Sequence, residues 1–282
     1  MRAIDLHAHL TTAEMNRAMG KYNAAMEKHY RFKLDDKTPE QMAQDFIKAD
    51  VKGFLMGWNA ESASGLPRCT NDHLMQVVKS SPQAFLGGFA GVDPWAGEMA
   101  IQEAERAVKV LGATGLKFQP AVQAFFANDR KFYPLWEKCV ELKIPVQFHT
   151  GTTGVGAGLP GGMGIKLKYC QPLVYDDLAA DFPGLTIIAC HPSYPWQDEM
   201  IAVLVHKANV VNELSGWSPK YFSDALKKEI NGRLQDKFMF GSDYPAISHE
   251  RLFKDWEAQN FKPEVMDKVY IKNAQRILGL TL

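Results

Sequence analysis

The sequence predicts an α/β fold, a single (β/α)8 TIM barrel that spans residues 1–282. Eight short apolar runs, typical of buried parallel strands, alternate with longer segments in which apolar residues recur at helical spacing. The length is close to the roughly 250 residues of a typical barrel. An open doubly wound sheet is the alternative, but no glycine-rich dinucleotide fingerprint follows the first run.

The predicted elements alternate along most of the chain. Strands are expected at residues 3–9, 51–58, 84–92, 113–120, 144–151, 185–192, 210–216 and 238–245. Helices are expected at residues 38–50, 97–112, 129–143, 171–184, 195–208 and 218–232. The first of these helices has a clear start signal, because Thr38 and Pro39 precede its apolar residues.

Two stretches interrupt the alternation. Residues 11–37 after the first strand are long for a connection in a barrel, and residues 150–172 after the fifth strand are rich in glycine and lack periodicity. Both begin at the C-terminal end of a strand, where barrel enzymes keep their active sites. We expect both to be loops that cover or line a binding site, or else disordered segments.

Composition excludes several classes of protein. Lysine plus arginine and aspartate plus glutamate both number 32, and this balance argues against a nucleic-acid or membrane partner. The four cysteines show no C-x-x-C spacing, so reduced thiols and a cytoplasmic location are expected. No segment approaches the roughly 20 apolar residues of a membrane span. The expected partner is a small molecule, and a homo-oligomer is left open.

The first strand carries a pair of histidines. In a strand, side chains two residues apart share a face, so Asp5, His7 and His9 are expected on one side. The other side is expected to hold Ile4, Leu6, Ala8 and Leu10. Two imidazoles that face the same way can share a metal ion.

Further candidate ligands follow other strands. His149 ends the fifth strand and Asp243 ends the eighth, and with His7 and His9 they form a nitrogen-rich set. This set suits one divalent ion, with Zn²⁺ expected first and Mn²⁺, Fe²⁺ or Co²⁺ as alternatives. His191 ends the sixth strand and remains as a spare imidazole that could move a proton or polarise a substrate oxygen.

Other residues at strand ends are candidates for substrate binding. Lys117 could contact a substrate carboxylate or serve only as a charge partner. Aromatic and polar side chains that could contact a planar substrate, or simply pack beneath the loops, are Trp58, Asn59 and Trp217. Lys166 and Lys168 in the glycine-rich segment could bind an anionic group such as a phosphate. His73, His206 and His249 are expected to be solvated surface or cap residues.

The motifs that carry these residues resemble those of the amidohydrolase superfamily. They are "DLHAHL", "GLKFQP", "FHTG", "CHP", "FGSDYP" and the closing "NAQRILGL", and the resemblance runs from Ile4 to Leu280. The closest likeness is to the branch related to aminocarboxymuconate-semialdehyde decarboxylase and resorcylate decarboxylase. The resemblance implies His7, His9, His149 and Asp243 as metal ligands and His191 as the catalytic histidine. It also implies one metal, since this branch is usually mononuclear, whereas in binuclear relatives a carboxylated lysine on the fourth strand bridges two metals. The motif "GLKFQP" around Lys117 is similar to that of the mononuclear branch.

The expected activity is that of a metal-dependent hydrolase of a carbonyl compound from aromatic catabolism. The glycine-rich segment resembles that of 4-hydroxyphenyl-β-ketoacyl-CoA hydrolases, which implies retro-Claisen hydrolysis of an aromatic β-ketoacyl-CoA thioester. Asp243 would take a proton from water, and His191 would stabilise an oxyanion or protonate the leaving group. The alternative is a non-oxidative decarboxylase of a hydroxybenzoate- or muconate-type acid, which would use the same site. A barrel that has lost catalysis and only binds a ligand is a third reading.

Overall fold

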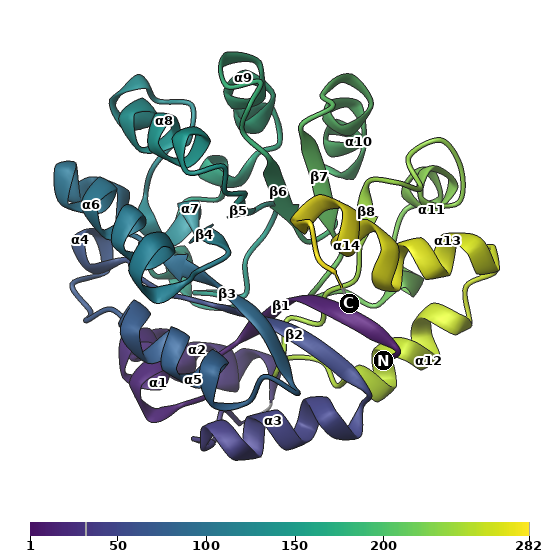
Figure 1. Cartoon of the computed structure of the whole chain (residues 1–282), viewed down its shortest axis with the longest axis horizontal. Coiled ribbons are helices and arrows are strands. Elements are labelled where there is room, and N and C mark those ends of the chain that lie inside the picture. Colours follow the sequence, from purple (N-terminus) through teal and green to yellow (C-terminus); the bar gives the residue numbers. More distant parts are fainter. Residues whose placement is uncertain (32, 282) are drawn as a thin grey trace.

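Eight parallel strands form one sheet in which the strand order follows the chain order. The computed structural model describes residues 1–31 and 33–281. The strands are β1 (Ala3–His9), β2 (Val51–Met56), β3 (Phe85–Gly91), β4 (Gly115–Phe118), β5 (Val146–His149), β6 (Ile187–Cys190), β7 (Val210–Glu213) and β8 (Phe238–Met239). Figure 1 shows helices around the outside of this sheet, so the predicted (β/α)8 barrel is confirmed.

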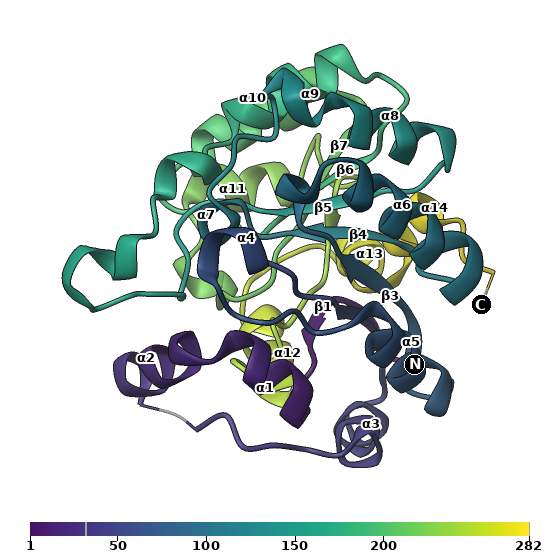
Figure 2. The ribbon, with the colours of Figure 1, turned by 90° about the vertical axis from the view of Figure 1, so that its left-hand side faces the viewer.

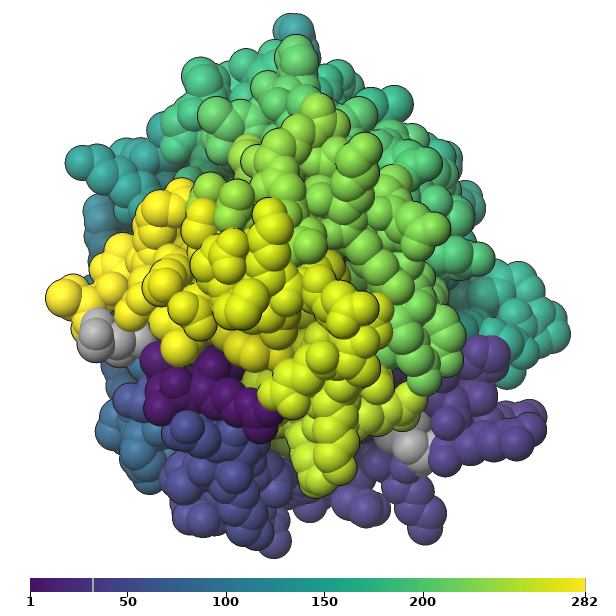
Figure 3. Space-filling model, turned by 90° about the vertical axis from the view of Figure 1, so that its right-hand side faces the viewer, coloured from purple at the N-terminus to yellow at the C-terminus, as the bar shows by residue number. Residues whose placement is uncertain are grey.

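Backbone hydrogen bonds close the barrel between the last strand and the first. The Asp243 N–H donates to the His7 carbonyl at 2.9 Å, and the His9 N–H donates to the Tyr244 carbonyl at 2.9 Å. Figure 3 shows the purple N-terminal residues against the yellow C-terminal helices on the same face of the molecule. This closure brings the C-terminal ends of β1 and β8 together, although they lie at opposite ends of the sequence.

The helices include all six predicted segments and several that were not predicted. They are α1 (Ala13–Met19), α2 (Lys21–Tyr30), α3 (Pro39–Lys48), α4 (Glu61–Ser64), α5 (Asn71–Ser80), α6 (Glu98–Arg106), α7 (Pro120–Gln123), α8 (Tyr133–Glu141), α9 (Leu173–Asp181), α10 (Gln197–His206), α11 (Asp224–Ile230), α12 (His249–Glu257), α13 (Pro263–Asp267) and α14 (Asn273–Leu278). Helix α3 begins with a capping box, because the Thr38 hydroxyl accepts from the Gln41 N–H and the Gln41 side chain accepts from the Thr38 N–H. Its start is therefore set by local sequence.

Apolar side chains from most of the strands form a cluster inside the barrel. This inner cluster comprises Ile4, Leu6, Phe54, Met56, Phe89, Ile188, Val211, Met239 and Ala274. Ile271, Ile277, Leu278 and Leu280 from the C-terminal segment pack against it. In β1 the inner-cluster residues precede His7 and His9, so a polar site can form only toward the other end of the barrel.

The first strand departs from the predicted alternation. Its pairing with β2 shifts register between Asp5 and Ala8. Leu6 belongs to the inner cluster, whereas Ala8 packs in the outer core under the helices. The prediction that these two side chains share a face is therefore wrong, because an irregularity in a strand re-aims the side chains around it.

Asp5 also differs from the prediction, because it does not lie with the two histidines. Its buried carboxylate accepts hydrogen bonds from the Ser242 N–H at 2.9 Å and from His249 Nε2 at 2.8 Å. His249 was predicted to be a surface or cap residue, and it is instead buried. Together Asp5 and His249 tie β1 to the segment between β8 and α12.

The two long insertions pack against each other at one end of the barrel. Residues 11–37 contain α1 and α2, so the predicted first loop is largely helical. A Cβ atom on Gly154 would lie 3.1 Å from the Tyr30 ring, and one on Gly158 would lie 2.2 Å from His29 Nδ1. The glycine-rich segment therefore lies directly on α2, and Figure 2 shows both on the same side of the barrel.

A search for membrane spans among the described residues found no helix with the length and apolar character to cross a bilayer.

Candidate metal centre

A cavity of about 680 Å³ lies where the strands end and the two insertions meet. Five of the predicted site residues line it together: His7, His9, His149, His191 and Asp243. They come from β1, from β5 and from the segments that follow β6 and β8. The structure therefore brings the predicted set together, and the roles assigned to its members remain predictions.

Three donor atoms converge in this cavity. His9 Nε2 lies 3.2 Å from His7 Nε2 and 3.1 Å from Asp243 Oδ1, and His7 Nε2 lies 3.5 Å from the same carboxylate oxygen. For ligand bonds of about 2.0–2.2 Å, two donors on one tetrahedral ion are separated by roughly 3.3–3.6 Å. This triangle therefore has the size and the chemistry to hold a divalent metal ion.

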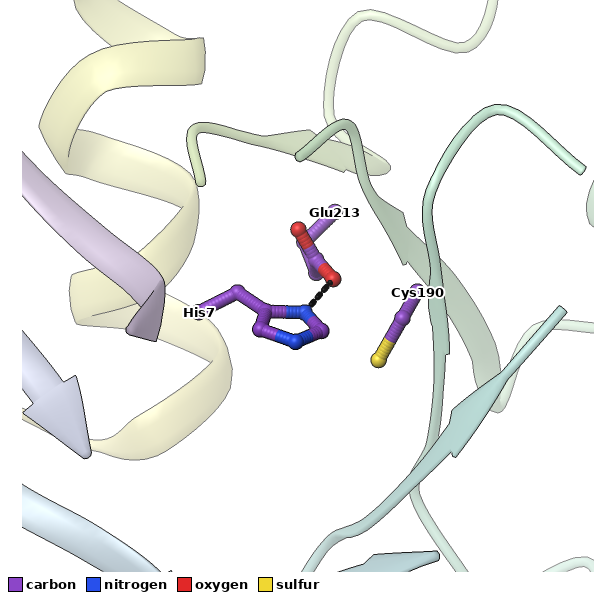
Figure 4. A group of neighbouring side chains, drawn as sticks. All are labelled: His7, Cys190 and Glu213. Atoms are coloured by element: carbon purple, nitrogen blue, oxygen red, sulfur yellow. Dashed lines mark hydrogen bonds and ion pairs between the residues drawn. The ribbon is translucent and has the colours of Figure 1, made fainter. Parts of the chain in front are cut away.

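Glu213 at the end of β7 fixes the orientation of the His7 ring. His7 Nδ1 lies 2.6 Å from Glu213 Oε1, and both side chains are buried (Figure 4). Because an ionised carboxylate only accepts hydrogen bonds, His7 carries its proton on Nδ1 and leaves the lone pair of Nε2 pointing toward His9 and Asp243. Sequence reasoning missed Glu213, although a carboxylate at the end of a barrel strand was a usable signal.

A chain of hydrogen bonds connects His149, His191 and Ser215. His149 Nε2 lies 2.9 Å from the Thr152 carbonyl, and since a carbonyl only accepts, this nitrogen carries the proton. His149 Nδ1 lies 2.9 Å from His191 Nε2, and His191 Nδ1 lies 2.9 Å from the Ser215 hydroxyl oxygen and 3.1 Å from the Ser215 carbonyl oxygen. His149 therefore shares the cavity with the donor triangle, but its ring is engaged with His191.

Ser215 also connects this chain to the donor triangle. Its hydroxyl oxygen lies 3.1 Å from His7 Nδ1, and its N–H donates to Glu213 Oε2 at 2.9 Å. The Ser215 hydroxyl thus lies next to both His7 and His191, for which the sequence predicted separate roles.

Backbone conformation brings these side chains into the cavity. His191 and Asp243 have φ angles of 68° and 60°, values that are uncommon for residues other than glycine. Between them lies Gly216, where a Cβ would be 3.0 Å from both Asp243 Oδ2 and His191 Nδ1. Unusual backbone at the ends of two strands and a glycine that makes room for the side chains are typical of a functional site.

Burial sets the charge of the site. It lowers the pKa of His7 and His149 well below the usual value and that of His191 to about 4, so all three rings are neutral at pH 7. Burial also acts to raise the pKa of Asp243, but the hydrogen bond from His9 and the nearby imidazoles outweigh it and hold that pKa well below the usual range. Neutral imidazoles beside an ionised carboxylate are the forms that bind metal ions.

Lys117 lies deeper, beside Cys190. Its ammonium group donates to Cys190 Sγ at 2.9 Å, and Lys117 also lines the cavity. Cys190, His7 and Glu213 are close enough to form a second donor group (Figure 4). Burial raises the pKa of the Cys190 thiol well above its usual value. The thiol therefore keeps its proton, and Glu213 acts on His7 rather than as part of a metal site.

The remaining predicted contacts divide into two groups. The side chains of Trp58, Asn59 and Trp217 line the cavity. Lys166 and Lys168 do not line it, and the Lys168 ammonium lies over the ring of Tyr169 at 5.2 Å. The glycine-rich segment thus reaches the cavity through its first residues, and an anion site at these two lysines stays a prediction.

Comparison with known proteins gives the family. The family model described as Amidohydrolase matches residues 4–280. The chain belongs to the amidohydrolase family.

Individual similar proteins agree with this assignment. The chain is 26% identical over 212 residues to a 2-amino-3-carboxymuconate-6-semialdehyde decarboxylase of Dictyostelium discoideum, and the match covers 66% of this amidohydrolase and 58% of that protein. The match thus spans less than two thirds of the relative's length. A TIM-barrel protein of Bordetella bronchiseptica has a similar structure, with a TM-score of 0.80, 23% identity and 99% of both chains covered. A dihydroxybenzoic acid decarboxylase of Polaromonas, solved with manganese and 2-nitroresorcinol, has a TM-score of 0.73 at 19% identity and covers 99% of this chain and 97% of its own.

Proposed function

We propose that this amidohydrolase is a metal-dependent, non-oxidative decarboxylase of a hydroxybenzoate- or muconate-type acid. The observation that carries the proposal is the donor triangle of His7, His9 and Asp243 in one cavity with the neutral imidazole of His191. A relative named as a decarboxylase of an amino-carboxymuconate semialdehyde and a similar structure named as a decarboxylase of a dihydroxybenzoic acid support the same reaction.

The proposed metal ligands are His7, His9 and Asp243, and His149 would be the fourth if its Nδ1 exchanged His191 for the ion. A bound divalent ion would supply a positive charge that holds a substrate carboxylate and a neighbouring oxygen. Zinc suits this donor set, and manganese is the ion in the similar Polaromonas structure. The metal is thus proposed as one divalent ion per chain, with its identity to be measured.

The reaction replaces a carboxylate by a hydrogen atom. The carbon–carbon bond to the carboxylate breaks, CO2 leaves, and the vacated carbon takes a proton. In our proposal His191 relays this proton from solvent: its neutral ring gives up the proton on one nitrogen while it takes one up on the other, so the ring ends neutral again. Asp243 stays ionised next to it and is the second group that could exchange a proton with the substrate. Lys117 is proposed to contact a substrate carboxylate or hydroxyl from the β4 side of the cavity.

The hydrolase reading that the sequence favoured has less support. It rested on the resemblance of the glycine-rich segment to that of 4-hydroxyphenyl-β-ketoacyl-CoA hydrolases. Two of the three similar proteins named above are decarboxylases. Hydrolysis of an aromatic β-ketoacyl thioester therefore becomes the second candidate.

Isotope labelling separates the two reactions. Metal-loaded protein is incubated with 2,6-dihydroxybenzoate and with an aromatic β-ketoacyl thioester, once in D2O and once in H2¹⁸O. Decarboxylation puts one deuterium on the product carbon and no ¹⁸O in the product, and we expect this result. An ¹⁸O-labelled acid from the thioester, with no CO2 from the benzoate, would instead establish the hydrolase.

Two histidine variants provide the matched test of the site. His191→Ala should retain the metal and lose at least about 100-fold in turnover, as expected for removal of a general acid. His206→Ala should leave metal content and turnover unchanged, because the side chain of His206 is 75% exposed on α10. Equal turnover in the two variants would contradict the role of His191.

A further inference from the structure

The cavity is larger than a one-ring acid requires. A dihydroxybenzoate has about eleven non-hydrogen atoms, and even at about 30 Å³ each, the share of a whole water molecule in the liquid and so an upper limit for a bonded atom, it fills at most roughly 330 Å³. The cavity measures about 680 Å³. About half of the space is therefore left after such an acid has been placed at the donor triangle.

Side chains of α1 and α2 form part of the cavity wall. Met15 and Met19 line it from α1, and Met26 and Tyr30 line it from α2, so each pair lies four residues apart on one face of its helix. We call these four residues the methionine wall. Methionine side chains are flexible and polarisable, so they adapt to apolar groups of different shape.

The polar residues of the same two helices are already engaged. Asn16 and Asn23 also line the cavity, but the Asn23 side chain donates to Asn16 at 2.9 Å, and Asn16 donates to Asp36 at 2.6 Å. Because these amides have partners within the protein, the methionine wall presents mainly apolar surface to a ligand.

The glycine-rich segment covers this part of the cavity. Gly154 and Val155 line it, and Gly154 and Gly158 lie directly on α2, as Figure 2 shows for the two segments. Lys166 and Lys168 stand outside the lining. The space beside the methionine wall is thus covered by backbone and an apolar side chain and does not offer lysines to a polyanion.

We propose that the substrate is an acid with an uncharged apolar arm, and that the arm lies along the methionine wall. The placement of the acid group rests on the proposed decarboxylase function. The inference of an apolar arm is drawn from the volume of the cavity and from the apolar character of the methionine wall. Met19 and Met26 are then specificity-determining residues, because they select acids by what is attached opposite the carboxylate.

Binding of non-reacting ligands tests the arm apart from catalysis. The probes are 2-nitroresorcinol, which has no carboxylate to lose, and its 5-phenyl derivative, whose ring points away from the nitro group. Calorimetry on metal-loaded protein should show that the phenyl derivative binds at least about tenfold more tightly, because it buries an additional apolar ring. Equal or weaker binding, or no binding of either probe, would overturn the proposal.

Substitutions locate the arm. Met26→Trp should abolish the preference for the phenyl derivative and leave the affinity for 2-nitroresorcinol within about twofold, because the larger side chain occupies the arm space. Met26→Ala gives a second measurement that does not depend on fitting a larger side chain, and it should also weaken the phenyl derivative alone. Met99→Trp is the matched control, since Met99 is 70% exposed on α6 and should change neither affinity. A uniform loss of both ligands in the Met26 variants would contradict the proposal.

Turnover distinguishes this inference from the proposed function. CO2 release is measured in parallel from 2,6-dihydroxybenzoate and its 4-phenyl derivative. Faster release from the phenyl acid supports both the reaction and the arm. Tight binding of the phenyl probe without CO2 release from either acid would reject the decarboxylase function and support the arm.

Discussion

Replacing Glu213 by glutamine should weaken metal binding without removing a metal ligand. Glu213 accepts from His7 Nδ1 at 2.6 Å through one oxygen and from the Ser215 N–H at 2.9 Å through the other. Glutamine has only one acceptor oxygen, and its NH2 group would face one of these two N–H donors. One buried hydrogen bond must therefore be lost, or His7 must move its proton to Nε2 and give up the lone pair that faces the metal.

Either outcome sets how much zinc affinity the Glu213→Gln variant should lose. Leaving a buried donor without a partner costs about 1–3 kcal/mol. Loss of a carboxylate that orients a metal-binding histidine typically weakens metal binding by about tenfold to a hundredfold. We therefore expect the dissociation constant for zinc to rise by that factor in Glu213→Gln.

Competition with a fluorescent chelator measures the zinc affinity directly and does not depend on activity. Circular dichroism and urea unfolding of the metal-free variant show whether the fold is intact. Ser215→Ala is the matched control, because it keeps the N–H that donates to Glu213 and removes only the hydroxyl. A folded Glu213→Gln protein with the wild-type zinc affinity would refute the assignment of the His7 tautomer.

Three further predictions concern stability and packing. Burial lowers the pKa of His191 from the usual 6.5 to about 4. Between these pH values the unfolded chain binds a proton on this ring and the folded chain does not, so the folded state loses stability as the pH falls from 6.5 toward 4. The metal-free protein should lose roughly 3 kcal/mol of unfolding free energy over this range, and equal urea midpoints at the two ends would contradict it. Asp5→Ala leaves the buried His249 ring without its hydrogen-bond acceptor and should lower the unfolding free energy by about 2–4 kcal/mol in urea unfolding. A loss below about 0.5 kcal/mol would show that water replaces the carboxylate. Gly241→Ala would place a Cβ 2.4 Å from Glu213 Oε2. The amount of bound metal, measured by mass spectrometry, should therefore fall even though no proposed ligand changes. Full metal content would show that the backbone around residue 241 can move aside.

Much of the barrel could be predicted because its strands are short apolar runs with helical segments between them. Helix α5 was missed although Thr70 caps it and apolar residues follow at helical spacing. The predicted loop over residues 11–37 is largely helical, because Tyr22 and Ala25 of α2 are buried in the folded structure. Short helices of this kind depend on tertiary packing for their stability, which local sequence does not reveal.

The candidate site was predictable where each side chain lies at a strand end. His7, His9, His191 and Asp243 meet because all barrel strands end at one face. Glu213 and the buried pair of Asp5 and His249 were not found. Their roles depend on contacts between residues more than 200 positions apart, such as the one that joins Glu213 to His7, and strand periodicity gives no information about such pairs.

The closure of the barrel has a consequence for how the protein acquires its metal. His7 and Asp243 come from opposite ends of the chain, and they approach each other only after β8 has paired with β1. A ribosome-bound chain that has not yet released its last strand lacks the donor triangle. Metal that binds the folded chain in preference to the unfolded one stabilises it by mass action. Uptake of the ion would then mark the completion of synthesis and folding, and a chain truncated before residue 238, which lacks Asp243, would bind the ion much more weakly.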